Sequence, residues 1–393
     1  MYIPYFEVLS LAIVISIIAY YWPFYGLIFS TASLAIGTEL IEEHVPHGIA
    51  LAILSFVEML PELGVELSIV MMAVFDPKFI IYISSNFTGA NRILIGIGWP
   101  IIFFVLCLKN RSFVREVELD NVIAVYAIFL LTVNVLYFYI VFFHELNIFI
   151  GVIMIFIFLI FLYVQYRIKS NGRDYDEYMK ITKKIRERGG NGMLYVLPVV
   201  LIVGGGILLY ISADPFVTEL MAISSVLGIS TYYFIQWVAP FITEFPELST
   251  AALWSKNGKG STPLAALVSS QFEQWSVMIG VIPIVYFIFD GGHSFFIPLD
   301  NLQVTEVLLT VMQSLFSAVI LLKMKIKQWE FIVIFVLWIA DIVSVSVDSI
   351  LNIGDFIHIV IIVIYALLIV TEIYLYHYDM KNLLIRLKKM YTQ

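Results

Sequence analysis

Charge and cysteine are both scarce in this chain. Of its 393 residues 13% are charged and 61% are hydrophobic, and Cys107 is the single cysteine, which excludes a disulfide within the chain. The N-terminus lacks a basic stretch and an obvious small-residue cleavage site, so we expect no cleavable signal peptide. The metalloprotease signature His-Glu-x-x-His is also absent, and no histidine lies at mid-span beside the glutamates, so we expect no enzyme.

Long apolar runs are abundant instead. Runs of about 20 apolar residues, the length that crosses a hydrocarbon core of roughly 30 Å, recur from end to end. They are continuous rather than alternating in hydrophobicity, which excludes a β-barrel. The sequence therefore predicts an all-α polytopic membrane protein. We expect about eleven spans, at residues 5–43, 46–75, 78–108, 119–143, 146–167, 193–228, 230–254, 262–290, 302–323, 329–348 and 355–377.

Basic residues predict which side of the membrane each loop faces, because Lys and Arg favour cytoplasmic loops. The longest polar stretch, Lys169 to Gly192, carries seven Lys and Arg residues. If this stretch lies inside, the other basic loops fall inside as well, and the opposite loops are neutral or acidic. We therefore expect the N-terminus outside, the C-terminus in the cytoplasm, and a location in the cell membrane.

Two short stretches place carboxylates and a proline inside hydrophobic segments. They are Glu58-Met59-Leu60-Pro61-Glu62-Leu63 and Thr243-Glu244-Phe245-Pro246-Glu247-Leu248, and the offset between their prolines is 246 − 61 = 185. Charge at membrane depth costs from a few to more than ~10 kcal/mol, so it is kept mainly where it acts. A proline also frees a backbone carbonyl that can face a cation. The duplication predicts a cation site built from two related halves.

The layout of helices around these stretches repeats at the same offset. The first half has five spans, an odd number, so the second half enters the membrane from the opposite side, as in secondary transporters with inverted repeats. We expect residues 1–168 to form the first repeat, 169–192 a charged cytoplasmic linker, 193–350 the inverted repeat, and 351–393 an additional transmembrane helix with a basic cytoplasmic tail.

The carboxylates of the two stretches are the candidate cation ligands. Glu62 and Glu247 match across the repeat, each beside its proline. Several carboxylates share a low-dielectric site only with a cation or with protons, and Ca2+ takes six to eight carboxylate, carbonyl and amide oxygens. The third and eighth helices supply candidate amides, Asn91 and Gln274, which could instead form hydrogen bonds between helices.

Other charged residues near these stretches have several open roles. Glu58 and Glu244 are not at equivalent offsets, and could carry protons, act as extra ligands or pair with Arg92. Glu66 either joins the same helical stripe of acids or faces water at the mouth of the site. Arg92, near mid-membrane, needs a partner, and Glu58, Glu66 and Glu273 are its candidates.

At these residues the chain resembles the cation/calcium exchanger superfamily. Its hallmark is two inverted repeats, each with a carboxylate motif on the second helix and an amide or acid on the third. Leu60-Pro61-Glu62 and Phe245-Pro246-Glu247 are similar to its Leu-Pro-Glu signatures, and the resemblance covers roughly residues 5–348. It implies an antiporter that exports Ca2+ by sliding the first and sixth helices over a rigid core. By motif position the implied ion ligands are Glu62, Glu247, Asn91, Gln274 and the Thr243 carbonyl.

Departures from the superfamily patterns favour H+ as the counter-ion. Sodium exchangers typically read Gly-Thr-Ser-Leu-Pro-Glu, whereas here the preceding positions read Val57-Glu58-Met59 and Ile242-Thr243-Glu244, so most of the hydroxyls are replaced. An Asn/Gln pair on the third helices is similar to the cation/proton exchangers, although that branch usually has a histidine where this chain has Leu248. The chain is therefore identified as a divergent member closest to the Ca2+/H+ exchanger branch.

The resemblance implies a secondary active antiporter that exchanges Ca2+ for H+ by alternating access, with ion and proton competing for the paired glutamates. A Na+/Ca2+ exchanger is the main alternative. A passive cation channel is a further one, although channels usually arrange their acids in a ring around an axis. We expect Ca2+, H+ or Na+ and the lipid bilayer as partners, no nucleic acid and no prosthetic group, and we make no prediction of oligomeric state.

Overall fold

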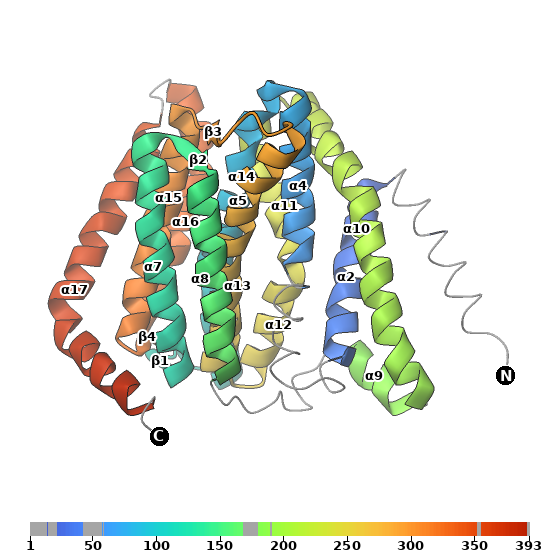
Figure 1. Ribbon diagram of the computed structural model, residues 1–393. Helices are drawn as coiled ribbons and strands as arrows, with labels where there is room; N and C mark the ends of the chain where they lie inside the picture. Colours follow the sequence, from blue (N-terminus) through green and yellow to red (C-terminus); the bar gives the residue numbers. More distant parts are fainter. Residues whose placement is uncertain are drawn as a thin grey trace. The chain divides into compact units, whose positions relative to one another are not determined.

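Helix makes up nearly all of the regular structure. The computed structural model describes residues 14, 22–41, 57, 59–167, 180–188, 191–351 and 355–390, and its helices and short strands are drawn in Figure 1. The elements up to the charged linker are α2 (Pro23–Ile41), α4 (Leu60–Phe75), the 3-10 turn η1 (Pro77–Phe79), α5 (Ile80–Ile93), the π-helical segment η2 (Leu94–Gly98), α6 (Trp99–Asn110), β1 (Glu116–Glu118), α7 (Asn121–Phe143), β2 (Glu145–Asn147) and α8 (Ile148–Arg167). The remaining elements are α9 (Lys180–Arg188), α10 (Asn191–Leu227), α11 (Thr231–Thr243), α12 (Phe245–Lys256), α13 (Ser261–Glu273), the π-helical segment η4 (Gln274–Met278), α14 (Ile279–Phe289), β3 (Phe296–Pro298), α15 (Asn301–Leu322), β4 (Lys325–Lys327), α16 (Gln328–Leu351) and α17 (Phe356–Met390).

Nine helical stretches among the described residues are long and apolar enough to cross a membrane. They coincide with nine of the eleven predicted spans, and the predicted all-α polytopic architecture is confirmed. The other two predicted spans are those with the carboxylate–proline stretches. In 46–75 the described helix α4 begins at Leu60, and in 230–254 the chain forms two shorter helices, α11 and α12, that meet at Glu244.

The second half of the chain repeats the elements of the first. Asn91 and Gln271, near the ends of the two third helices, differ by 180 in sequence number. The starts of η2 and η4, β1 and β3, α7 and α15, and β2 and β4 all differ by the same amount. The Pro-Glu pairs keep the larger offset given by their prolines. The difference arises mainly because α12 has 12 residues where α4 has 16.

The strand pairing shows that the two halves are inverted. β1 and β2 lie at opposite ends of α7, and β3 and β4 lie at opposite ends of α15. Because β1 pairs antiparallel with β4 and β2 with β3, α7 and α15 run in opposite directions. The register is symmetric as well, since the pair Glu116 and Lys327 is the repeat equivalent of the pair Phe296 and Asn147. With 23 residues α7 is roughly 34 Å long, which separates the two sheets by about the thickness of a hydrocarbon core.

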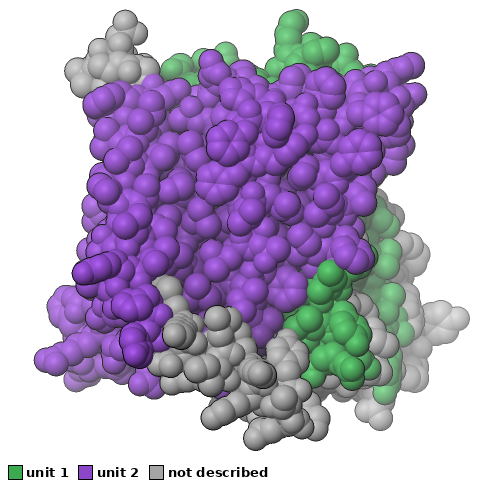
Figure 2. Space-filling model, turned by 60° about the vertical axis from the view of Figure 1, so that its left-hand side comes forward, with its two compact units in different colours: residues 1–86, 159–246 green, residues 87–158, 247–393 purple. Residues whose placement is uncertain are grey.

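The chain divides into two compact units, coloured separately in Figure 2. Unit 1 comprises residues 1–86 and 159–246, and unit 2 comprises residues 87–158 and 247–393. The divisions fall inside α5, α8 and α12.

In unit 1, α2 and α10 lie side by side (Figure 1). The Ser30 hydroxyl of α2 donates to the Gly205 carbonyl of α10 at 2.8 Å. A side chain at Gly205 would meet Leu34 at 3.0 Å, whereas Gly204 and Gly206 have open space. Helix α10 also packs on α4 and α11, so one long helix joins α2 to the helices that carry Glu62 and Thr243.

In unit 2, the core lies between α6, α7, α13, α15, α16 and α17. Phe103 and Phe331 stack with ring centroids 5.2 Å apart. α8 and α14 approach closely, because a side chain at Gly151 would come within 2.5 Å of the Gly280 carbonyl oxygen. α17, which follows the two repeats, packs against α15 and α16.

Several helices present apolar side chains outward. Phe156 of α8 is 61% exposed, and Leu367 and Val370 of α17 are 63% and 65% exposed. Large apolar side chains cover a surface in this way where lipid, rather than water, is the solvent.

Candidate functional site

Glu62 lies in the first turn of α4, directly after Pro61. Proline is favoured there because the first N–H groups of a helix have no intrahelical acceptor, and the helix dipole stabilises a carboxylate at that end. The Glu62 side chain is buried and is hydrogen-bonded to the side chains of Thr243 and Glu244. Two carboxyl groups form a hydrogen bond only when one of them carries a proton, so the Glu62–Glu244 pair is suited to share a proton.

Glu66 lies one turn further along α4 and is fully buried. Asn86 Nδ2 donates to Glu66 Oε2 at 3.1 Å. The structure therefore places Glu66 in a buried stripe with Glu62 rather than facing water, and its role toward an ion stays a prediction. Among the described residues, Oε1 of Glu62 and Oε1 of Glu66 have no hydrogen-bond partner. Glu58, the third acid of the predicted stripe, lies outside the described residues.

The equivalent stretch of the second half is a break between two helices. α11 ends at Thr243, and the Glu244 N–H still donates to the Pro240 carbonyl at 2.8 Å. α12 then begins at Phe245, with Pro246 and Glu247 in its first turn. The side chains of Thr243 and Glu244 are buried, and that of Glu247 is half-buried. A helix C-terminus has a partial negative charge and free carbonyl oxygens, both of which suit a cation.

The third helices of the two halves carry amides at equivalent positions. Asn91 of α5 corresponds to Gln271 of α13 in the repeat, and both are fully buried. Asn91 Nδ2 donates to the Gln271 carbonyl at 3.2 Å, and Gln271 Nε2 donates to the hydroxyls of Ser314 at 3.1 Å and Ser317 at 3.3 Å. In the described structure neither amide oxygen, Asn91 Oδ1 or Gln271 Oε1, has a hydrogen-bond partner. Bare amide oxygens of this kind are ligands that Ca2+ takes.

Gln271 is not among the ligands predicted from the sequence, which predicts Gln274 from its place near the middle of the eighth helix. The offset of 185 between the two prolines does not relate Asn91 to Gln271, because the shorter α12 reduces the offset before the third helix. The motif Leu119-Asp120-Asn121, which recurs as Leu299-Asp300-Asn301, is the signal that could have found it. Gln274 begins η4 and is buried, as is Glu273, which accepts a hydrogen bond from Ser269 Oγ at 3.0 Å. Gln274 stays a predicted ligand.

A buried polar network holds Gln271 in place. Asn134 Nδ2 donates to Ser314 Oγ at 2.9 Å, and Asn134 Oδ1 accepts from the Trp275 indole at 2.9 Å. Asn134 and Ser314 are themselves repeat equivalents, so the network lies at the internal two-fold axis. Each amide is followed one turn later by a π-helical segment, a distortion often found at functional sites.

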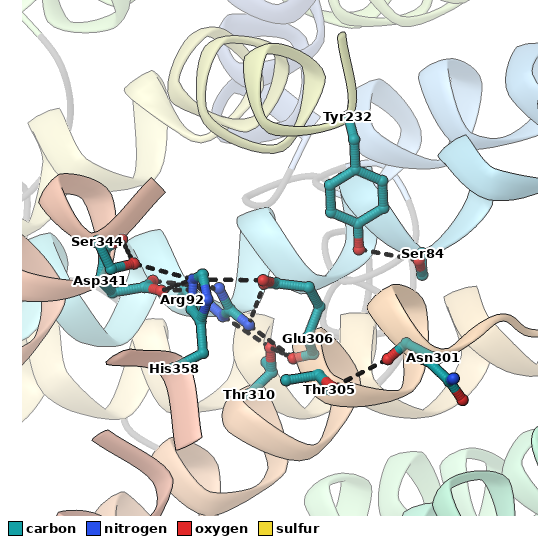
Figure 3. Close-up of polar contacts among 10 residues, drawn as sticks. All are labelled: Ser84, Arg92, Tyr232, Asn301, Thr305, Glu306, Thr310, Asp341, Ser344 and His358. Atoms are coloured by element: carbon teal, nitrogen blue, oxygen red, sulfur yellow. Dashed lines mark hydrogen bonds and ion pairs between the residues drawn. The ribbon is translucent and has the colours of Figure 1, made fainter. Parts of the chain in front are cut away.

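Arg92 has two carboxylate partners that were not among its predicted ones. Its Nη2 lies 2.7 Å from Glu306 Oε2, and its Nη1 lies 3.1 Å from Asp341 Oδ2 (Figure 3). Its Nε donates to the Thr310 hydroxyl at 2.8 Å. The guanidinium is 1% exposed, so its charge is neutralised inside the protein.

The candidate residues belong to both units. Unit 1 holds Glu62, Glu66, Thr243 and Glu244, and unit 2 holds Glu247, Asn91, Arg92, Gln271, Glu273 and Gln274. Within each unit the residues supply buried carboxylate, hydroxyl or amide oxygens, the hard ligands of alkaline-earth cations.

An inverted repeat with interrupted, acid-bearing helices defines the class of secondary transporters built from such repeats. Comparison with known families makes this specific. The chain belongs to the sodium/calcium exchanger protein family, whose sequence model matches residues 9–167 and 197–347.

Solved structures agree with this assignment. The chain is similar to the crystal structure of the H+/Ca2+ exchanger CAX, with 26% identity, a TM-score of 0.84, and coverage of 99% of this chain and 95% of that one. It is similar in fold to two structures of the sodium–calcium exchanger NCX_Mj soaked with Na+ and Sr2+. These have 19% and 20% identity, each with a TM-score of 0.50, and cover 84% and 85% of this chain and 99% of each of theirs. A direct sequence comparison with curated proteins found no match.

Proposed function

We propose that the chain is a secondary active antiporter that exchanges Ca2+ for H+ across the membrane by alternating access. The observation that carries this proposal is the hydrogen bond between the buried carboxyl groups of Glu62 and Glu244. A proton shared by this pair would be an exchangeable proton on a residue of the duplicated Pro-Glu motif, which supports H+ as the counter-ion. The similarity to an H+/Ca2+ exchanger over 99% of the chain supports the same counter-ion.

The exchange follows from charge compensation. When the glutamates lose their protons, their charges and the bare oxygens favour a divalent cation. When they are protonated they are neutral and need no ion. Moving a buried charge across the membrane is unfavourable unless it is compensated, so the carrier changes its accessible side mainly in the two compensated states.

The proposed ligands combine the sequence prediction with the structure. Glu62 and Glu247 stay the predicted carboxylate ligands, and Asn91, Gln274 and the Thr243 carbonyl stay the other predicted ligands. We add Gln271, because its oxygen and that of Asn91 are equivalent and lack partners among the described residues. Glu244 and Glu66 are proposed to hold protons, and neither Arg92 nor Glu273 is proposed to touch the ion.

A Na+/Ca2+ exchanger is the second candidate. The family description and the fold shared with NCX_Mj favour it. Against it stand the residues before the two Pro-Glu pairs, where small hydroxyl residues of sodium exchangers are replaced by Glu58, Met59 and Glu244. In either case the N-terminus is proposed to lie outside and the C-terminus in the cytoplasm of a cell membrane.

Flux into proteoliposomes tests the proposal. Uptake of radioactive Ca2+ would be measured with either a pH gradient or a Na+ gradient at clamped membrane voltage. We expect uptake driven by the pH gradient, which Glu62→Gln and Glu247→Gln abolish and the exposed control Glu118→Gln retains. Uptake that requires Na+ would show that the counter-ion is Na+ rather than H+. A passive conductance without coupling would indicate a channel. No flux under either gradient would contradict calcium exchange.

A further inference from the structure

A second cluster of buried charges lies around Arg92, outside the Pro-Glu motifs. It joins four helices of unit 2, because Arg92 lies on α5, Glu306 on α15, Asp341 on α16 and His358 on α17 (Figure 3). The side chains are between 0% and 5% exposed. His358 Nε2 lies 3.3 Å from Asp341 Oδ1 and 3.4 Å from Glu306 Oε1. The imidazole therefore lies between the two carboxylates that also bind the guanidinium.

The repeat does not account for this cluster. At the offset that relates Asn91 to Gln271, the equivalents of Arg92, Glu306 and Asp341 are Phe272, Tyr126 and Phe161. α17 follows the last repeated element, α16, and has no counterpart. The cluster is thus confined to one half, with aromatic residues at the matching places of the other. A feature needed only to build the repeated fold would be expected in both halves.

Charge counting identifies what the cluster holds. Two carboxylates and one guanidinium leave a net charge of −1 in a buried site, which is unfavourable. One proton brings the sum to zero. A divalent metal ion on the same oxygens would raise the sum to +1 beside a fixed guanidinium, although one ligand atom from each of Glu306, Asp341 and His358 lies within 4.8 Å of the others. The charge balance therefore favours a proton over a metal ion.

The hydrogen bonds require that His358 Nε2 carries a hydrogen, and a second proton on the ring, which makes it an imidazolium, is the one that the charge balance calls for. Ser344 Oγ donates to the Asp341 carbonyl at 2.6 Å and lies 3.0 Å from His358 Nε2, so its one hydrogen is used and it accepts from the ring. Nε2 thus faces three acceptors, namely the Ser344 hydroxyl and the two carboxylates. Tyr365, also on α17, is a further titratable group that interacts with Asp341 and Arg92.

We propose that Arg92, Glu306, Asp341 and His358 form a proton-binding site separate from the exchange site, with His358 as imidazolium when the proton is bound. Arg92 directly follows the candidate ligand Asn91, so the charge state of the cluster acts on the helix that presents this amide. Loss of the proton leaves one uncompensated negative charge between α5 and α17 and weakens their packing. The cluster thereby makes exchange depend on pH through a group other than the paired glutamates. This inference does not depend on whether the counter-ion is H+ or Na+.

Solid-state NMR of the full-length protein in liposomes, labelled with 15N-histidine, tests the site without transport. Imidazolium and the two neutral tautomers give distinct nitrogen signals. We expect an imidazolium signal at about pH 8, where an ordinary histidine, with a pKa near 6.5, is neutral. We expect His358→Gln to remove this signal. Asp341→Asn should also remove it although His358 is still present, because the remaining carboxylate and guanidinium already balance. Ser344→Ala keeps the charge count and should keep the signal.

Several results would overturn the proposal. A neutral His358 at about pH 8 in the unaltered protein would do so, whether or not any variant folds. An imidazolium signal that persists in Asp341→Asn would refute the charge balance. One equivalent of a transition metal in the purified protein, lost in His358→Gln, would assign the cluster to a metal instead. In the flux assay, His358→Gln is expected to shift the pH profile of Ca2+ exchange, whereas Glu62→Gln is expected to abolish exchange. The two variants therefore test the second proton site and the exchange site independently.

Discussion

At the scale of single residues, Asn91 and Gln271 are bound through their amide nitrogens and keep their oxygens bare among the described residues. This arrangement orients both carbonyl oxygens without occupying them. A leucine of similar size at either position would fill the space but supply no ligand.

We therefore predict that Asn91→Leu and Gln271→Leu each weaken Ca2+ binding by roughly 10–100-fold, the range seen when residues around a metal are removed. Isothermal titration with Ca2+ measures the effect. Asn110→Leu, at the exposed end of α6, is the matched control and should bind normally. Unchanged affinity in Gln271→Leu would remove Gln271 from the ligand set.

Lys327, between the candidate spans of α15 and α16, donates a hydrogen bond to the Tyr376 hydroxyl, and this bond raises the pKa of Lys327. The pKa of Lys327 is higher in the folded state than in the unfolded chain, where it is about 10.4. The stabilisation from this hydrogen bond is therefore complete below the unfolded-state pKa and is lost as the pH rises through the folded-state pKa. We predict that Tyr376→Phe lowers the melting temperature at pH 8 and has progressively less effect above about pH 10.5. An equal lowering of the melting temperature at pH 8 and above about pH 10.5 would argue against this bond.

At the scale of elements, Gly151 and Gly280 let α8 and α14 touch backbone to backbone. A side chain at Gly151 would meet a carbonyl oxygen, which cannot move away as the end of a flexible side chain can. We predict that Gly151→Ala destabilises the protein by about 1–3 kcal/mol, as overpacking usually does. Gly204→Ala, with open space around it, is the control, and thermal unfolding in detergent compares the two. Equal stability of both variants would contradict the close approach.

Helix α17 is held to the repeats at a second charged site. Lys323 Nζ, after α15, bonds to Glu330 Oε1 of α16 and lies 2.8 Å from Glu372 Oε2 of α17, with all three side chains fully buried. Removing one partner of a buried ion pair typically costs about 3–5 kcal/mol. We predict that Lys323→Met destabilises the protein by about that amount and opens α17 to protease near Glu372. The double change Lys323→Met with Glu372→Gln should recover part of the loss, and no recovery would show that the pair is not coupled.

Much of the fold could be predicted from the sequence, because lipid demands continuous helices and the apolar runs mark their lengths. Glu62 and Glu247 could be singled out because a charge and a proline interrupt such runs. Gln271 could not be found by a single offset, since the shorter helix α12 shifts the register between the halves. The partners of Arg92 escaped prediction for another reason: they lie on α15, α16 and α17, and contacts between helices far apart in sequence leave no local pattern.

At the scale of the whole molecule, the internal two-fold symmetry explains which features occur twice. The strand pairs, the π-helical segments and the amides follow it. The cluster around Arg92 and the helix α17 do not. The features that occur twice supply ligands proposed for exchange, and the features that occur once supply the proposed second proton site. The two proposed functions therefore belong to different elements of the chain.

Competition between Ca2+ and protons for the same carboxylates is the central claim, and proton release on binding tests it most directly. Ca2+ would be added to purified protein in a weakly buffered solution, and the protons released would be counted with a pH indicator. We predict acidification that saturates together with Ca2+ binding and is lost in Glu62→Gln. Calcium binding to the unaltered protein with no release of protons would contradict the account.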